Sequence, residues 1–261
     1  MDTEFIILII SAFITSSISA IIGMGGGIIL LGIMAIMIPE GYMVIALHGI
    51  IQLFSNTTRT YIFREHLKKK LIIDFSKGAF LGLSLSAICI IILIRLFNVE
   101  SASEIKVEIL KPLIGIFIIW FLFLKKPKKS IQRKLSFIPV GAISGLTTVF
   151  IGATGPLIAP FFLDGKLSKN NIIANKAACQ MITHAGKIPL FIFFFNIDYI
   201  GQYEILLPLI LAVFLGTNLG KSLLKFIPEN IFRILFKTAL TIIAVRLILI
   251  NIDLKFILQI F

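Results

Sequence analysis

Eight long apolar segments dominate this chain and limit what it can fold into. About 20 consecutive apolar residues are enough for a helix to cross the hydrocarbon core of a bilayer. Only 15% of the 261 residues are charged, against about 25% in soluble domains, and the mean hydropathy is +1.03. The segments run over Phe5–Ile38, Met43–Ile62, Leu71–Phe97, Val107–Leu124, Leu135–Leu163, Ile172–Phe195, Ile205–Phe226 and Ile231–Ile250. The sequence therefore predicts an all-α, polytopic membrane protein with no soluble catalytic domain.

The charge and the cysteines exclude several kinds of site. The net charge is +12, but the basic residues form brief clusters between apolar segments, so we expect no nucleic-acid partner. Cys89 and Cys179 fall inside apolar segments without metal-ligand or CxxC spacing, so we expect no metal site, disulfide or cofactor. The N-terminal "MDTEF" is acidic where a signal peptide would be basic, so we expect the first segment to be retained.

The distribution of Lys and Arg predicts which connections face the cytoplasm. Basic "REHLKKK", "KKPKKSIQRK" and the stretch with Lys221, Lys225 and Arg233 are expected inside, whereas "NVESASE", "NIDY" and "MDTE" are expected outside. With these sides fixed, the first and the fifth segment must each begin and end on the same side. We therefore expect both to be helical hairpins that turn within the membrane, in a multi-pass protein of the cytoplasmic (plasma) membrane.

The two halves of the chain resemble one another. "IIGMGGGIIL" aligns with "FIGATGPLIA", which pairs Gly23 with Gly152 and Gly26 with Gly155. Each half would hold a broken hairpin and three crossings, so the second half would insert upside down, as in many secondary transporters with a substrate site near the midplane. The expected units are a first half (1–124), a basic cytoplasmic linker (125–134), a second half (135–250) and a C-terminal tail (251–261). Chance likeness between apolar stretches is the alternative.

Polar residues recur on one face of the second and the sixth segment. The alignment pairs His48 with Lys176, Gln52 with Gln180, Asn56 with His184 and Arg59 with Lys187. Ionisable groups inside a membrane are costly and mark a functional site by default. We expect substrate binding from Gln52, Asn56, Gln180 and His184, and charges along the pathway from His48, Arg59, Lys176 and Lys187. Alternatively, Arg59 and both lysines snorkel to the headgroups and the amides only join helices.

The glycines at the two repeats predict breaks in the helices. Freed backbone N–H and C=O groups must be satisfied by protein or a watery cavity, and new helix N-termini near Gly27 and Pro156 would attract an anion. We therefore expect anion binding by backbone amides of Gly25, Gly26, Gly27, Thr154 and Gly155. The alternative, close helix packing, is the interpretation we prefer for the pairs Gly78 with Gly82 and Gly216 with Gly220.

Four stretches spread over the chain carry a family resemblance: "SAIIGMGGGIILL", "SGLTTVFIGATGPLIAPFF", "NKAACQMITHAGKIPLFIF" and "FLGTNLGKSL". They are similar to the TauE/SafE family of sulfite exporter-like permeases. The resemblance implies a permease that moves sulfite, sulfonates and related small organosulfur anions across the cytoplasmic membrane. This implication agrees with the anion site inferred from the glycine breaks.

The function that we expect is secondary transport of a small anion by alternating access. The chain has no ATP-binding motif, so a proton or sodium gradient would drive uphill movement, with His184 as a proton carrier. A passive anion channel needs the same basic residues and stays open as an alternative. An intramembrane enzyme would need Ser55 or Thr183 beside a histidine, but neither lies in a nucleophile motif, so we expect no enzyme. The expected partners are a small anion and the lipid bilayer, and a homodimer stays open.

Overall fold

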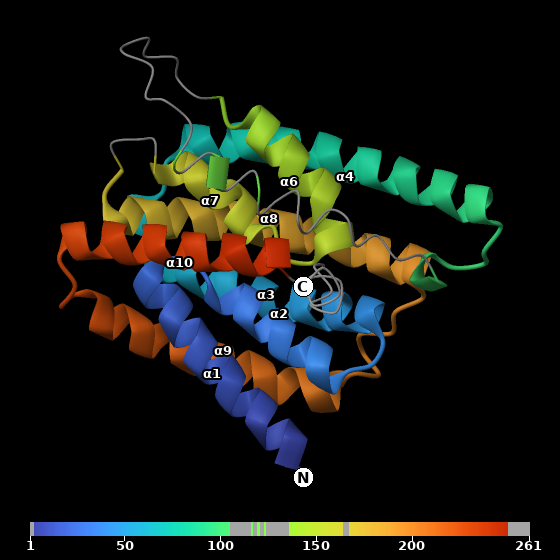
Figure 1. Cartoon of the computed structure of the whole chain (residues 1–261), viewed down its shortest axis with the longest axis horizontal. Helices are drawn as coiled ribbons and strands as arrows, with labels where there is room; N and C mark the ends of the chain where they lie inside the picture. Colours follow the sequence, from blue (N-terminus) through green and yellow to red (C-terminus); the bar gives the residue numbers. More distant parts are fainter. Residues whose placement is uncertain are drawn as a thin grey trace, which may run out of the picture.

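The structure, a computed structural model, describes residues 3–104, 116, 119, 120, 123, 136–163 and 167–249, and every regular element in this part is helical (Figure 1). The elements are α1 (Thr3–Ile22), α2 (Gly26–Met37), α3 (Gly41–Ile62), η1 (Arg64–His66), α4 (Lys69–Phe97), η2 (Ala102–Glu104), α6 (Ile138–Ile151), α7 (Gly155–Leu163), α8 (Lys169–Phe195), α9 (Tyr203–Leu224) and α10 (Glu229–Leu249). Four helices, α1, α4, α8 and α9, are long and apolar enough to cross a membrane. The predicted all-α polytopic membrane fold is confirmed.

Seven of the eight predicted apolar segments coincide with helices to within a few residues. The first segment forms α1 and α2, the fifth forms α6 and α7, and five others form one helix each. Most of the fourth segment, the predicted linker 125–134 and the tail 251–261 lie outside the described residues.

The long helices pack as three neighbouring pairs, α4 with α6, α3 with α8, and α1 with α9 (Figure 1). The α3/α8 pair is the middle one, because α3 also packs on α9 and α8 also packs on α4. Helix α10 lies across this arrangement and contacts α1, α7 and α8. The two helices that carry the polar residues are therefore enclosed by the rest of the fold.

Glycines bring the backbones of the outer pairs into contact. A Cβ built on Gly78 would lie 1.9 Å from the Ile138 carbonyl oxygen, and one on Gly82 would lie 2.0 Å from that of Ala142. No side chain fits in such a space, so these helices approach through backbone alone. The corresponding distance is 2.2 Å for Gly216 and 2.4 Å for Gly220, both on α9 against α1. The packing interpretation of these two glycine pairs is confirmed.

Both glycine-rich stretches interrupt the helices, as the sequence predicts. Helix α1 ends at Ile22 and α2 begins at Gly26, whereas α6 ends at Ile151 and α7 begins at Gly155. Gly23, Gly25 and Gly152 have φ values of 84°, 95° and 79°. These values lie in the left-handed region that side chains with a Cβ avoid, which explains why glycine occupies the breaks.

Each broken segment doubles back on itself. The rings of Phe137, just before α6, and Phe162, at the end of α7, lie 5.3 Å apart between centroids. In the first segment, Leu8 of α1 and Met34 of α2 belong to one core cluster. Helix α2 has 12 residues and α7 has nine, or about 18 and 14 Å at 1.5 Å per residue. Neither is long enough to cross the hydrocarbon core of about 30 Å.

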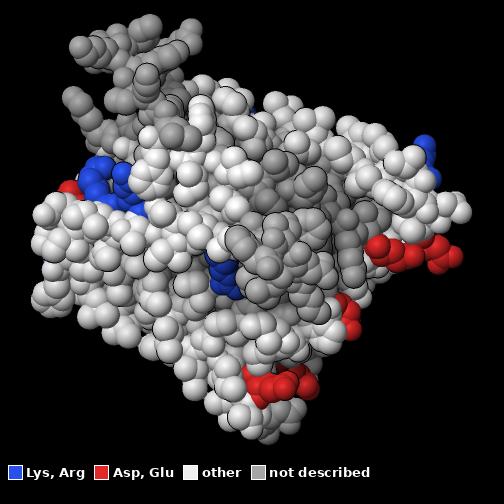
Figure 2. Space-filling view, viewed as in Figure 1, with Lys and Arg blue, Asp and Glu red and all other residues white. Residues whose placement is uncertain are grey.

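The polar connections gather at the two ends of the helices. At one end the Asn175 side chain donates to the His66 carbonyl oxygen, and Glu229 accepts from the backbone N–H of Lys169. At the other end the Ser101 hydroxyl donates to the Phe194 carbonyl oxygen. On the face in Figure 2, Lys and Arg gather at the left, with one more basic patch in the centre and one at the upper right, and most Asp and Glu lie at the right and lower right. This partial separation of charge has the direction that the predicted sidedness requires.

Candidate functional site

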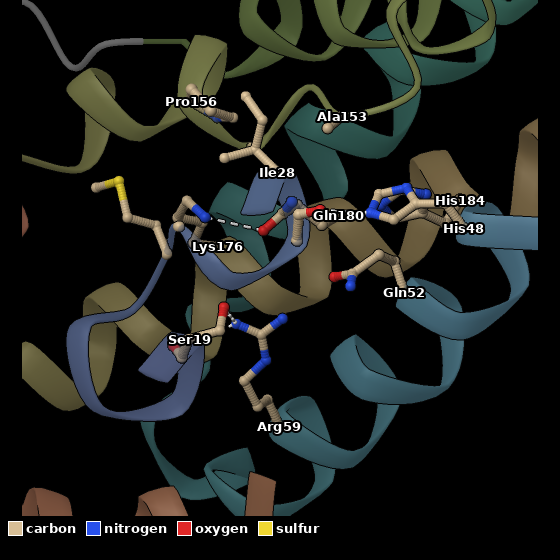
Figure 3. Close-up of a pocket in the computed structure, with 14 residues that line it drawn as sticks. Ser19, Ile28, His48, Gln52, Arg59, Ala153, Pro156, Lys176, Gln180 and His184 are labelled. Atoms are coloured by element: carbon tan, nitrogen blue, oxygen red, sulfur yellow. Dashed lines mark hydrogen bonds between the residues drawn. The ribbon is translucent and has the colours of Figure 1, made fainter. Parts of the chain in front are cut away.

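A small pocket lies where the two helix breaks meet the middle pair, α3 and α8 (Figure 3). It is lined by Ser19, Met24, Gly25, Gly27, Ile28, His48, Gln52, Arg59, Ala153, Gly155, Pro156, Lys176, Gln180 and His184. Its volume is about 20 Å³, and one water molecule needs about 10–15 Å³. The pocket therefore has room for a very compact ligand.

The starts of α2 and α7 both face this pocket, and each does so through a glycine. Gly27 lies in the first turn of α2, and Gly155 begins α7. The first N–H groups of a helix have no acceptor within it and carry partial positive charge. At α2 the residue before the helix, Gly25, supplies no side-chain cap. The two helix starts thus bring backbone N–H donors and positive potential to one place, although Pro156 at the start of α7 has no N–H.

A glutamine from the middle pair lies against each of these glycines. A Cβ on Gly27 would be 2.9 Å from Gln52 Oε1, and a Cβ on Gly155 would be 2.6 Å from Gln180 Nε2. Glycine is therefore needed at both positions for the amide side chain to reach the helix start. The alignment pairs Gln52 with Gln180 but Gly155 with Gly26, so the glycine that meets the glutamine is shifted by one residue between the two halves.

Arg59 holds its guanidinium inside the protein through contacts to α1 and α3. Its NH1 donates to Ser19 Oγ at 2.9 Å, and its NH2 donates to Asn56 Oδ1 at 2.7 Å. The Asn56 side-chain amide in turn donates to the Gln52 carbonyl oxygen at 2.7 Å. Asn56 is fully buried and does not line the pocket, so its contacts orient Arg59.

The two lysines of α8 bind the carbonyl groups of the breaks. Lys176 Nζ donates to the Gly23 carbonyl oxygen at 3.2 Å and to Gln180 Oε1 at 2.9 Å (Figure 3). Lys187 Nζ donates to the Gly152 carbonyl oxygen at 3.1 Å and to that of Ile45 at 3.3 Å. A cation next to the carbonyl end of a helix is electrostatically favourable. Lys176 lines the pocket, whereas Lys187 does not.

Two histidines stand side by side at the pocket. The ring centroids of His48 and His184 are 6.0 Å apart, with an edge-on arrangement. His48 Nε2 lies 2.7 Å from the Gly27 carbonyl oxygen, and because a carbonyl can only accept, this nitrogen carries the hydrogen. His184 is 1% exposed, and neither of its ring nitrogens has a hydrogen-bond partner among the described residues.

Among the residues that the structure describes, the buried charge in this region is entirely positive. The buried polar residues of the described chain include Arg59, Lys176 and Lys187, at 2%, 1% and 0% exposure, and no Asp or Glu. This burial contradicts the snorkelling alternative, because all three charged heads bond to protein oxygens. Buried charges are normally paired. A region of cations without a carboxylate is suited to an anionic ligand.

The structure brings together most of the site residues that the sequence predicts. Gly25, Gly27, Gln52, Gly155, Gln180, His184, His48, Arg59 and Lys176 line the pocket. Four predicted residues lie behind the lining: Gly26, Asn56, Thr154 and Lys187. A Cβ on Gly26 would be 1.8 Å from the Thr15 carbonyl oxygen, so this glycine serves the packing of α2 on α1. Thr154 accepts a hydrogen bond from Ser144.

Sequence reasoning missed Ser19 as a lining residue. It lies on α1 in "TSSIS", where three serines and a threonine interrupt an otherwise apolar helix. That cluster of hydroxyls in a membrane segment is the signal that could have identified it. Pro156 was expected only as a helix-starting residue, and it also lines the pocket.

The two candidate hydroxyls, Ser55 and Thr183, do not bond to a histidine. Ser55 Oγ is buried without a partner, and Thr183 Oγ1 donates to the Gln180 carbonyl oxygen at 3.0 Å. In the described part of the chain no histidine nitrogen bonds to a hydroxyl. A nucleophile needs a base within hydrogen-bond reach, and this arrangement does not supply one.

Comparison with known proteins identifies a family. The family described as sulfite exporter TauE/SafE matches residues 8–247, which is nearly the whole chain. No curated protein and no solved structure matches. The match includes both helix breaks and the middle helix pair. This membrane protein belongs to the TauE/SafE sulfite exporter family, a family of transporters and not of enzymes.

Proposed function

We propose that the chain is a secondary transporter that binds a small oxyanion, such as sulfite or a small sulfonate, in the pocket between the two helix breaks. The observation that carries the proposal is the composition of this pocket. Two helix starts, Arg59 and Lys176 converge on one small space, and no buried Asp or Glu of the described chain opposes them. The sulfite exporter family supports an anion as the substrate.

The small size of the pocket favours a compact anion. Its volume of about 20 Å³ is the space that roughly one or two water molecules need. A sulfite ion fits such a site with small adjustments, whereas each added carbon of an organosulfonate needs more displacement. We therefore expect sulfite to bind more tightly than longer sulfonates.

The burial of the pocket favours alternating access over a passive channel. The polar side chains that line it are all buried, and the most exposed of them, Gln180, has only 8% of its surface accessible. Because these groups are buried, we expect movement of the helices to govern how an anion reaches them. In an inverted-repeat transporter, rocking of one half against the other opens a fixed site to each side in turn. We also propose that the two halves form an inverted repeat and that the protein lies in the cytoplasmic membrane.

The test is flux of labelled sulfite, sulfate and methanesulfonate in proteoliposomes, with and without proton or sodium gradients. We expect saturable sulfite uptake and counterflow, in which an internal unlabelled anion accelerates entry of the labelled one. The same flux is measured for Arg59→Gln, which removes a charge from the pocket. Arg64→Gln is its matched control, because Arg64 lies on the surface turn after α3, is exposed and does not line the pocket. Absence of flux for every anion would overturn the proposal, and flux without counterflow would favour a channel.

A further inference from the structure

His184 has an unusual environment within the pocket. It is 1% exposed, lines the pocket on α8, and has no partner for Nδ1 or Nε2 among the described residues. A neutral imidazole offers one donor and one acceptor nitrogen, and buried polar groups in proteins are nearly always hydrogen-bonded. In Figure 3 its ring lies beside His48 at one side of the pocket, with Gln180 next to it. The ligand of this pocket is therefore the natural partner for His184.

His48 contrasts with His184 although their rings are neighbours. His48 Nε2 donates to the Gly27 carbonyl oxygen at 2.7 Å, which fixes the ring and its tautomer. Its Nδ1 has no hydrogen-bond partner in the part of the chain that the structure describes. A proton on His184 would convert both of its ring nitrogens into donors, and neither donor is committed to the protein.

The charged groups of the described residues that act on His184 are bases or cations. Those groups are Lys187 and Lys176 on its own helix and His48 and Arg59 on α3. Helices α2, α6 and α7 contain no titratable residue, and α4 meets this region with the apolar Leu83 against Gly186. An imidazolium at this position would add one more positive charge to an uncompensated group of cations. An anion in the pocket supplies the missing negative charge and accepts the hydrogen bond.

We propose that His184 takes up a proton from solution when the pocket binds an anion, so that the anion and the proton occupy the site together. This inference rests on the proposed function and adds its coupling ion. The proton binds to the unprotonated ring nitrogen, so the ring gains a second N–H donor that is not committed to the protein. Because binding linkage is reciprocal, protonation strengthens anion binding by the same factor by which the anion strengthens protonation. The proton moves with the anion, as in a symporter.

The experiment measures proton uptake on anion binding to the purified full chain in detergent. Binding of sulfate and methanesulfonate, which stay ionised near neutral pH, is followed by calorimetry in Tris and in Bis-Tris. These buffers differ in their heats of ionisation, and neither is itself a sulfonate. Sulfite is tested at alkaline pH, where it is fully ionised. We expect uptake of about one proton per anion, and an affinity that falls about tenfold per pH unit while free His184 is unprotonated.

Variants separate His184 from the other histidines. His184→Gln keeps hydrogen-bonding atoms but cannot be protonated, so it should bind the anion without proton uptake and with a flat pH dependence. His184→Asn serves as a second variant if the first is poorly folded. His48→Gln should keep the proton uptake, although its affinity changes. The His66 ring contacts Asn170 in a surface turn outside the pocket. The variant His66→Gln should therefore behave as the unmodified chain.

Three outcomes would overturn the inference. Anion binding to the unmodified chain without proton uptake would reject it and leave the proposed function standing. Persisting proton uptake in both His184 variants would assign the proton to another group. If none of the three anions binds to the unmodified chain, the proposed function fails together with the coupling that rests on it.

Discussion

Lys176 Nζ lies 3.2 Å from the Gly23 carbonyl oxygen, so the sixth predicted segment is bonded to the break in the first, 153 residues earlier. The same ammonium group lies 2.9 Å from Gln180 Oε1 at the other break. Lys176 therefore bonds to the first break directly and reaches the second only through Gln180, which lies against Gly155. A ligand that draws this ammonium toward itself acts on both breaks at once, which gives the proposed transporter a physical route from binding to movement.

Substitution of the glycines at the helix starts should weaken anion binding without unfolding the protein. A Cβ at Gly27 or Gly155 would meet the end of a flexible glutamine side chain, which can move away. We expect Gly27→Ala and Gly155→Ala each to weaken sulfite binding about tenfold. This is the loss expected when the displaced glutamine takes away one hydrogen bond to a charged ligand. Gly41→Ala is the matched control at another helix start, because nothing lies within 4 Å of its Cβ. Unchanged affinity in both pocket variants would place the site elsewhere.

The two buried lysines of α8 should differ in their importance for binding. Lys176 lines the pocket and Lys187 does not. We expect Lys176→Gln to weaken sulfite binding about tenfold to a hundredfold, as a charge-assisted hydrogen bond is lost. Lys187→Gln should change affinity much less and act through the stability of the second break, where Lys187 bonds to Gly152. Dissociation constants and melting temperatures of both variants decide this. An equal loss of affinity would show that Lys187 also contacts the anion.

The geometry of Arg59, and not only its charge, should matter for transport. Its guanidinium contacts Ser19 on α1 and Asn56 on α3 at the same time. A lysine keeps the charge but not the planar, forked donors. We expect Arg59→Lys to lower the sulfite transport rate clearly, and Ser19→Ala, which removes only the contact at 2.9 Å, to lower it less. The initial rate of labelled sulfite uptake measures both. Full activity of Arg59→Lys would mean that the charge alone suffices.

Glycine packing between α4 and α6 should control stability independently of transport. A Cβ on Gly82 would lie 2.0 Å from the Ala142 backbone oxygen, whereas one on Gly186 would meet the end of the Leu83 side chain. Overpacking against rigid backbone typically costs about 1–3 kcal/mol. We therefore expect Gly82→Ala to lower the melting temperature in detergent and Gly186→Ala to do so much less. Equal melting temperatures would contradict the close approach of α4 and α6.

The predicted sidedness can be tested with an impermeant thiol reagent on intact cells. Single cysteines in place of Glu40, between α2 and α3, and of Asp198, between α8 and α9, should be labelled from outside. Cysteines in place of Lys68 and Lys225 should react only after the membrane is opened. Labelling of position 40 only from the cytoplasm would contradict the hairpin that returns to the outer side.

The sequence by itself determined the class of fold and the positions of the breaks. Long apolar segments can satisfy their backbone in a bilayer only as helices, and the glycine-rich stretches at Gly23–Gly27 and Gly152–Gly155 marked where two of those helices break. The spacing of His48, Gln52 and Arg59, repeated from Lys176 to Lys187, placed the polar residues on two helical faces. These are local properties of the chain, so periodicity and composition are enough to predict them.

Only the tertiary structure decided which of these residues share a pocket. Gly26 and Gly27 are neighbours in sequence, yet one packs on the Thr15 backbone and the other faces Gln52. Lys176 and Lys187 lie on one helical face, yet only the first reaches the pocket. Ser19 joins the site because α1 lies beside Arg59. Such outcomes depend on how closely helices approach and which side chain fills each gap, and a single helix does not contain that information.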